Sequence, residues 1–163
     1  MTQLQNAPAA LVYFAFAPAA LVLTRAVEDQ PELGLIDGLG FLLSITAVAI
    51  QYFADQQLRN FRATGSYKKG ISFQSGLWKY SRHPNYFCEV SMWWSIYLFS
   101  VGATGSALNW SILGVVFLTM LFLVPETGSL DCGEYLSSGK YKQYADYQKR
   151  VSKFIPWFPS KAS

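Results

Sequence analysis

The chain is poor in the residues that build metal sites, disulfide frameworks and soluble surfaces. Its 163 residues include two cysteines, one histidine and 14% charged residues. One histidine and two cysteines that are far apart in sequence, Cys88 and Cys132, match no spacing of zinc ligands. Two cysteines are also too few for a disulfide-stabilised scaffold. Low charge together with 52% hydrophobic residues excludes intrinsic disorder and is unusual for a soluble domain. The sequence therefore predicts one membrane domain over residues 1–163.

The motifs of soluble nucleotide-binding and hydrolytic enzymes are also missing. Gly38-Leu39-Gly40 is followed by Leu43 where a dinucleotide fingerprint needs another glycine. The sequence has no GxxxxGK[ST] loop, no GxSxG elbow and no second histidine for a catalytic triad. The net charge of +3 is too small to indicate a nucleic-acid partner, and we expect none.

Long uncharged runs are what the chain does have. No charged residue occurs before Arg25, between Asp37 and Asp55, or between Glu89 and Glu126. A helix needs about 20 apolar residues to cross a bilayer, and the third run is long enough for two helices joined at a glycine-containing turn. A cleaved signal peptide is the alternative for the first run. We expect an all-α integral membrane protein with about four transmembrane helices, over residues 8–25, 36–54, 86–103 and 107–124.

Basic residues are concentrated in two places. Twelve of the thirteen lysines and arginines lie within residues 59–82 and 140–161. The positive-inside rule therefore places the basic loop, residues 55–85, and both termini on the cytoplasmic or matrix side, with the organelle undefined. The tail, residues 126–163, has tyrosines at helical spacing and ends in aromatic residues. We expect it to form an interfacial amphipathic helix with its aromatics at headgroup depth.

A dense polar cluster lies at the predicted start of the third span. Residues 81–89 offer a guanidinium, an imidazole, an amide, a phenol and a carboxylate. With Pro84 as the first helical residue, Tyr86 and Glu89 share a face. A helix start beside an arginine and a histidine suits an anion such as phosphate. A purely structural role for the histidine is the alternative.

A second candidate group lies at the inner end of the second span. Asp55, Leu58 and Arg62 share one stripe if that helix continues past the bilayer. Carboxylates at span boundaries are costly unless paired or solvated, so Asp55, Glu89 and Glu126 are functional candidates. The alternative for each is an interfacial carboxylate that contacts water or a loop arginine, and this is the preferred interpretation of Glu126. A nucleotide-like cofactor needs cations for its phosphates and polar groups for its sugar, and the two groups together could supply both.

Three ordered blocks resemble a known family. Residues 76–89 followed by Trp93-Trp94 resemble the signature of the steroid 5-alpha-reductase-like membrane proteins, especially their domain-of-unknown-function 1295 branch. Residues 53–62 are similar to that family's aspartate-leucine-arginine helix, and residues 140–157 to its C-terminal tail. The resemblance implies a helical membrane fold in which NADPH, in a cytosol-facing cavity, reduces a carbon–carbon double bond conjugated to a ketone in a sterol or other lipid.

The resemblance also implies site residues and partners. If the chain is an active reductase, Tyr86 or Glu89 must donate the proton, or a partner chain must supply the donor. Membrane lipids and a sterol-like or other lipid substrate would be the partners. Two alternatives stay open. The first is a degenerate family member that serves as a structural subunit beside other membrane subunits, because family members commonly have further spans. The second is an isoprenylcysteine-type methyltransferase that uses S-adenosylmethionine. The cofactor-binding residues implied by the match are Asp55, Leu58, Arg62, Arg82, His83, Asn85, Tyr86 and Glu89.

Overall fold

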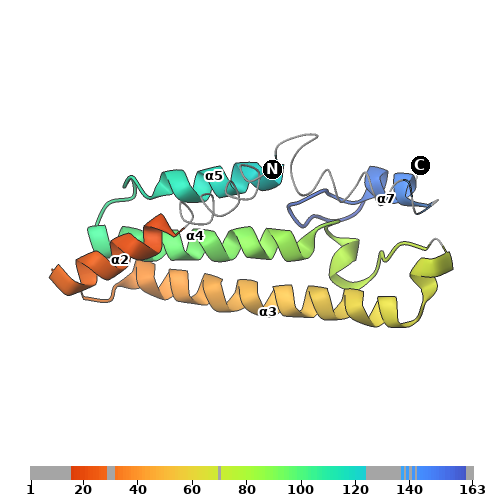
Figure 1. Cartoon of the computed structure of the whole chain (residues 1–163), viewed down its shortest axis with the longest axis horizontal. Helices are drawn as coiled ribbons and strands as arrows, with labels where there is room; N and C mark the ends of the chain where they lie inside the picture. The colour runs from red at the N-terminus through yellow and green to blue at the C-terminus, as the bar shows by residue number, and fades with distance from the viewer. Residues whose placement is uncertain are drawn as a thin grey trace, which may run out of the picture. The chain divides into compact units, whose positions relative to one another are not determined.

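The structure, a computed structural model, describes residues 16–28, 32–69, 71–123, 137, 139, 141 and 143–160. Every regular element within these ranges is helical, and no β-strand occurs among them (Figure 1). The all-α prediction is therefore confirmed for this part of the chain. The chain divides into two compact units: unit 1 is Met1–Ala47 with Val90–Leu121, and unit 2 is Val48–Glu89 with Phe122–Ser163.

The helices follow the uncharged runs with two clear differences. α5 (Ile112–Leu123) begins later than the predicted fourth span, which started at residue 107, because a polar turn precedes it. α3 (Leu35–Ala63) starts close to the predicted second span but continues beyond it, because residues 55–63 include glutamine, leucine, arginine and alanine, which favour helix, and contain neither glycine nor proline. Gly65, with φ +72°, then ends the helical path. The loop between α3 and α4 is consequently shorter than the predicted basic loop. The described elements are α2 (Ala17–Glu28), α3 (Leu35–Ala63), the short 3-10 helices η1 (Ser66–Lys69) and η2 (Gly76–Lys79), α4 (Pro84–Thr104), α5 (Ile112–Leu123) and α7 (Tyr144–Arg150).

Unit 1 packs α2, the first part of α3, the later part of α4 and most of α5. The ring of Phe16 meets the ring of Trp93 edge to face at 5.2 Å. α3 approaches α4 at Gly40, where an added Cβ would lie 3.2 Å from the backbone oxygen of Ser95. A small residue at this crossing therefore permits the close approach of the two helices. The core of unit 1 is formed by Tyr97, Val101 and Val115.

The long uncharged run of the sequence forms two helices, α4 and α5, with a polar turn between them. Asn109 organises this turn: its Oδ1 accepts hydrogen bonds from the backbone N–H (3.1 Å) and the hydroxyl (2.5 Å) of Ser111. Its Nδ2 donates to the hydroxyl of Ser100 at 3.2 Å. Both serines are fully buried, so the turn satisfies its own polar groups as burial requires.

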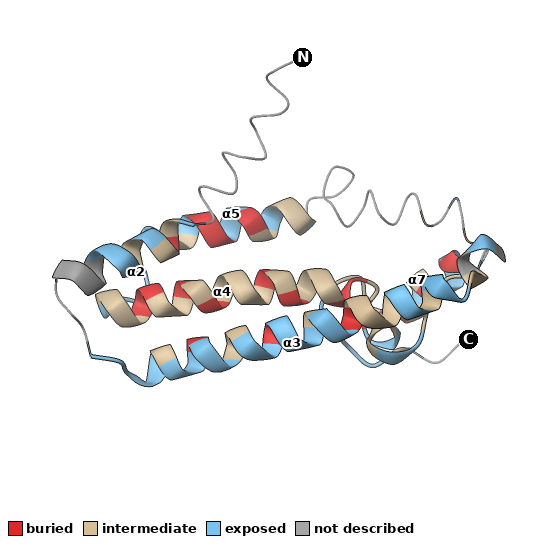
Figure 2. Cartoon of the chain, turned by 60° about the horizontal axis from the view of Figure 1, so that its bottom comes forward, coloured by how far each residue is buried: buried red, intermediate tan, exposed pale blue. Residues whose placement is uncertain are grey.

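Exposed residues run along α3 (Figure 2), and large apolar side chains are among the exposed residues of both α3 and α5. A contiguous apolar surface on a soluble monomer is unusual and indicates contact with lipid or another protein. Within the described residues, α3 is the one helix long and apolar enough to cross a membrane, and α5 is a shorter apolar helix. This supports membrane association weakly; the four spans and the side that each loop faces remain predictions. The exposed set includes Leu39, Phe41, Leu42 and Ile45 of α3 and Leu113, Phe117 and Met120 of α5.

Unit 2 contains the later part of α3, the loop with η1 and η2, the first turn of α4, and α7 with the chain that follows it. Tyr144, Tyr147 and Val151 form its buried cluster, with Tyr141 packed against them. The spacing of the tail tyrosines predicted one shared helical face, and Tyr144 and Tyr147 of α7 (Tyr144–Arg150) are buried together on one face. Other protein atoms cover that face, so it cannot contact lipid. The position of α7 at a membrane surface remains a prediction.

Candidate functional site

A cavity of about 230 Å³ in unit 2 gathers most of the predicted cofactor residues. Its walls come from the end of α3, the loop after it, the start of α4 and the region of α7. Two blocks that are separate in sequence, one on α3 and one around the start of α4, therefore contribute to the same concave surface. The predicted residues that line it are Leu58, Arg62, Arg82, His83, Asn85 and Tyr86.

Two arginines give the cavity a positive character. Arg62 stands in the last turn of α3 and is exposed, whereas Arg82 is half-buried just before α4. Guanidinium groups donate paired, charge-assisted hydrogen bonds to phosphate and carboxylate. The cavity therefore has the chemistry of an anion-binding site.

Asp55 and Asn85 connect the two predicted groups directly. The Nδ2 of Asn85, in the first turn of α4, donates a hydrogen bond to Oδ1 of Asp55 on α3 at 3.2 Å. Asp55 does not line the cavity, and it acts on the cavity through Asn85. The bond fixes the orientation of the Asn85 amide and leaves the amide oxygen to accept a hydrogen bond from a ligand.

The two candidate proton donors are placed differently. Tyr86 lines the cavity, with its ring parallel to the buried ring of His83 at a centroid distance of 5.7 Å. Glu89 lies one helical turn after Asn85 and is not among the cavity-lining residues. The third predicted carboxylate, Glu126, lies outside the described residues. The geometry therefore favours Tyr86 over Glu89.

An aromatic wall completes the cavity. Phe73 stacks on Phe61 of α3 at 5.0 Å, and its ring lies 6.3 Å from that of Trp78. The indole nitrogen of Trp78 donates to the backbone oxygen of Ala54 at 3.0 Å, which attaches η2 to α3. Sequence reasoning did not assign Phe61 and Phe73 to the site, because nothing in their local pattern marks a contact between the helix and the loop.

The chain after α7 pairs with the segment that carries Arg82. The N–H of Arg82 donates to the backbone oxygen of Ser152 at 2.9 Å, and the N–H of Trp157 donates to that of Tyr80 at 2.9 Å. We call this pairing of residues 152–157 with residues 80–82 the tail clasp. It joins segments about 70 residues apart, and so ties the C-terminal tail to the site.

Two side chains reinforce the tail clasp. The hydroxyl of Ser81, which is fully buried, donates to the backbone oxygen of Phe154 at 2.8 Å and accepts from the N–H of His83 at 3.1 Å. The hydroxyl of Tyr147 donates to the backbone oxygen of Trp78. These bonds satisfy polar groups that are shielded from water, so they hold the 78–83 segment in one position.

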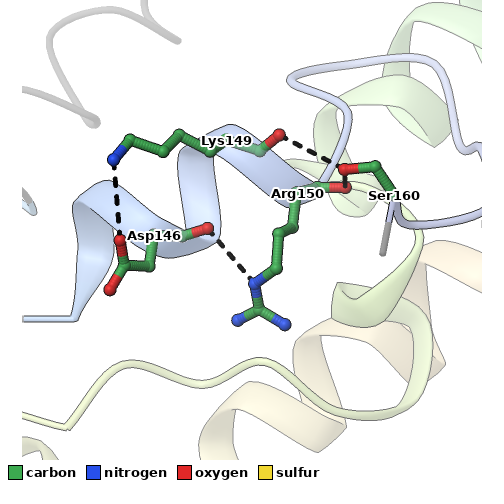
Figure 3. A network of polar contacts seen from close by, with 4 residues as sticks. All are labelled: Asp146, Lys149, Arg150 and Ser160. Atoms are coloured by element: carbon green, nitrogen blue, oxygen red, sulfur yellow. Dashed lines mark hydrogen bonds and ion pairs between the residues drawn. The ribbon is translucent and has the colours of Figure 1, made fainter. Parts of the chain in front are cut away.

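The end of α7 is fixed by a further polar network (Figure 3). The backbone N–H of Ser160 donates to the backbone oxygen of Arg150 at 2.9 Å, and Nε of Arg150 donates to that of Asp146 at 3.3 Å. Nη2 of Arg150 reaches Oε1 of Gln74 at 3.1 Å in the loop after α3. Lys149 and Asp146 form an exposed ion pair at 3.8 Å, which contributes little to stability.

Over the residues that the structure describes, the protein is all-helical, and its site is an aromatic-walled cavity that carries two arginines. The chain belongs to the family described as Protein of unknown function (DUF1295), whose profile matches residues 6–151. That family is related to the steroid 5-alpha-reductase-like proteins.

One curated relative also matches. The chain is similar to Uncharacterized protein C594.04c of Schizosaccharomyces pombe, with 40% identity over 82 residues, which cover 50% of this chain and 23% of that protein. The match thus spans less than a quarter of the relative's length. No solved structure matches the chain significantly.

Proposed function

We propose that the chain is a membrane-embedded, NADPH-dependent reductase of a conjugated carbon–carbon double bond in a sterol or other lipid enone, or the cofactor-binding part of one. One observation carries the proposal: residues from two separate sequence blocks, which the resemblance assigns to cofactor binding, line one cavity. Membership of the DUF1295 family is consistent with it.

The residues present fit NADPH in part. Arg62 and Arg82 would hold phosphate groups, and Asn85 would orient the ribose or the amide. Phe73 and Trp78 offer flat apolar surfaces against which a ring can pack. The volume of about 230 Å³ lies below the ~300–1,000 Å³ of pockets that enclose a small ligand. The cavity would therefore take one portion of the dinucleotide.

Tyr86 is the proposed proton donor. Reduction of an enone adds a hydride to one carbon and a proton to the other, and bound NADPH supplies the hydride. Tyr86 lines the cavity and carries a hydroxyl group, so it can give a proton to a substrate there. The parallel ring of His83, which is buried, limits the orientations of the phenol.

A second candidate is a non-catalytic subunit of a larger membrane complex. The observation that favours it is the exposed apolar surface of α3 and α5, which suits a protein neighbour as well as lipid. A stable assembly with other chains after mild detergent extraction, together with no cofactor binding, would support this candidate over the reductase.

The decisive experiment is titration of the detergent-purified chain with NADPH by calorimetry. We expect Arg62→Ala to weaken binding by about 10-fold or more, because a charge-assisted hydrogen bond to phosphate contributes about 1.5–3 kcal/mol. Arg59→Ala is the matched control: Arg59 is an exposed arginine on the same helix that does not line the cavity. We expect that variant to bind within about twofold of wild type, since it retains every cavity contact.

S-adenosylmethionine is titrated in parallel. Binding of this ligand without NADPH would favour the isoprenylcysteine-type methyltransferase. Equal losses in the Arg62 and Arg59 variants would mean that general charge, not the cavity, attracts the dinucleotide. No binding of either ligand to the intact chain would contradict the reductase proposal.

A further inference from the structure

Large apolar side chains are exposed within the tail clasp and at the residue that follows it. Ile155, Trp157 and Phe158 are 62%, 71% and 78% exposed, respectively. Single exposed apolar residues are common on proteins, but three within four consecutive positions form a patch that indicates a binding surface. None of the three lines the cavity, so the cofactor site does not account for them.

This patch is held in place by the tail clasp. The Trp157 N–H bonds to the backbone oxygen of Tyr80, and the ring of Phe158 meets the Tyr80 ring edge to face at 5.9 Å. Pro156 and Pro159 fix the backbone on both sides of the Trp-Phe pair and remove two N–H groups that would otherwise need partners. The aromatic patch, defined as Tyr80, Ile155, Trp157 and Phe158, thus presents its side chains from a fixed backbone.

Basic residues lie beside the aromatic patch or near it in sequence. Nζ of Lys79, an exposed residue, lies 6.0 Å from the centre of the Tyr80 ring. Residues 140–161, which include Ile155, Trp157 and Phe158, contain six lysines and arginines and one acidic residue, Asp146. Tryptophan and tyrosine prefer the headgroup layer of a bilayer, and basic side chains beside them are attracted to anionic lipid.

We propose that the aromatic patch docks into the headgroup layer of a lipid bilayer that contains anionic lipid. The charge around the patch selects this occupant over an apolar protein groove, and α3 of the same chain is long and apolar enough to cross a membrane. Docking goes beyond the proposed reductase function and does not depend on NADPH, because the patch and the cavity are lined by different residues.

The test measures how deeply individual labelled residues lie in the bilayer of lipid vesicles. The full chain, with Cys88 and Cys132 replaced by alanine, carries a fluorophore on Trp157→Cys and is reconstituted into phosphatidylcholine vesicles that contain phosphatidylserine. A headgroup-attached nitroxide lipid and aqueous iodide are the two quenchers. Ala145→Cys is the matched control, since Ala145 is exposed on α7 in the same unit. We expect the lipid quencher to act several-fold more strongly at position 157 than at 145, and iodide to show the reverse order.

Ile155→Cys provides a second labelled position, in case loss of the indole itself weakens docking. Labels at both 155 and 157 that are as accessible to iodide as the label at 145 would overturn the proposal. Labels protected from both quenchers would overturn it too, and would identify a protein partner as the occupant. NADPH binding is measured on the same vesicles, so a failure of docking is distinguishable from a failure of the reductase proposal.

Discussion

At the scale of single residues, Asn85 connects the two sequence blocks of the site. It lines the cavity and donates its side-chain N–H to Asp55 at 3.2 Å. A carboxylate accepts but cannot donate, so the pair depends on having one amide and one acid. Because the two side chains differ in this way, exchanging the amide and the acid between the two positions tests this hydrogen bond separately from the rest of the site.

Asn85→Asp should destabilise the chain, because it places two carboxylates face to face and removes the donor. We expect a loss of about 1–3 kcal/mol in the free energy of unfolding, measured by denaturation in detergent. Adding Asp55→Asn exchanges the two groups and should recover most of the loss. An exchanged double variant as unstable as the single one would show that this hydrogen bond does not hold the helices together.

Gly76 is required for two separate reasons. Its φ of +62° disfavours a side chain, and an added Cβ would overlap the Gln57 amide, whose Oε1 accepts the Leu77 N–H at 3.0 Å. Gly76→Ala should therefore cost about 1–2 kcal/mol for the backbone and about 1 kcal/mol more for the lost hydrogen bond. Thermal unfolding in detergent measures both costs.

Gly65→Ala separates these two costs. Gly65 has φ +72°, and an added Cβ there meets nothing within 4 Å, so only the backbone cost applies. Equal melting temperatures for the two alanine variants would contradict the role assigned to Gln57 in holding the loop.

At the scale of elements, helical periodicity made part of the site predictable. The positions of Asp55, Leu58 and Arg62 on one stripe follow from spacing alone once α3 continues to Ala63, as it does. Pro84 as the first residue of α4 was predictable in the same way. The tail clasp was not, because backbone pairing between segments about 70 residues apart leaves no local pattern.

The hydroxyl of Ser81 should be essential to the tail clasp. Ser81→Ala leaves the Phe154 oxygen and the His83 N–H without this partner, and we expect a loss of about 1–3 kcal/mol. Limited proteolysis should also cut the tail several-fold faster. Ser75→Ala is the matched control, since Ser75 is exposed and its side chain makes no capping bond. Equal cleavage of the two variants would contradict the proposed clasp.

At the scale of the whole molecule, exposed apolar surface is the dominant property. The composition predicted this surface, and the helices display it along α3 and α5. The number of spans could not be obtained in the same way, because α3 is the one described helix that meets both the length and the composition of a span.

Washing of isolated membranes tests whether the chain is an integral membrane protein. Burial of apolar surface in lipid contributes about 25 cal/mol per Å², so a helix as long and apolar as α3 should keep the chain in the bilayer. We expect the chain to remain in the membrane pellet after alkaline carbonate washing and to be released by detergent. A peripheral marker protein that carbonate releases serves as the control. Release of the chain by carbonate alone would contradict the transmembrane prediction.

The division into two units has a consequence for biosynthesis. Each unit is built from two stretches of chain, and the stretches alternate along the sequence. Neither unit can therefore be produced as a continuous fragment. During translation the first half of unit 1 must wait for Val90–Leu121, and unit 2 is completed only when Phe122–Ser163 has left the ribosome. The cavity, whose walls include Tyr144 and Tyr147, thus forms only after both stretches of unit 2 have been made.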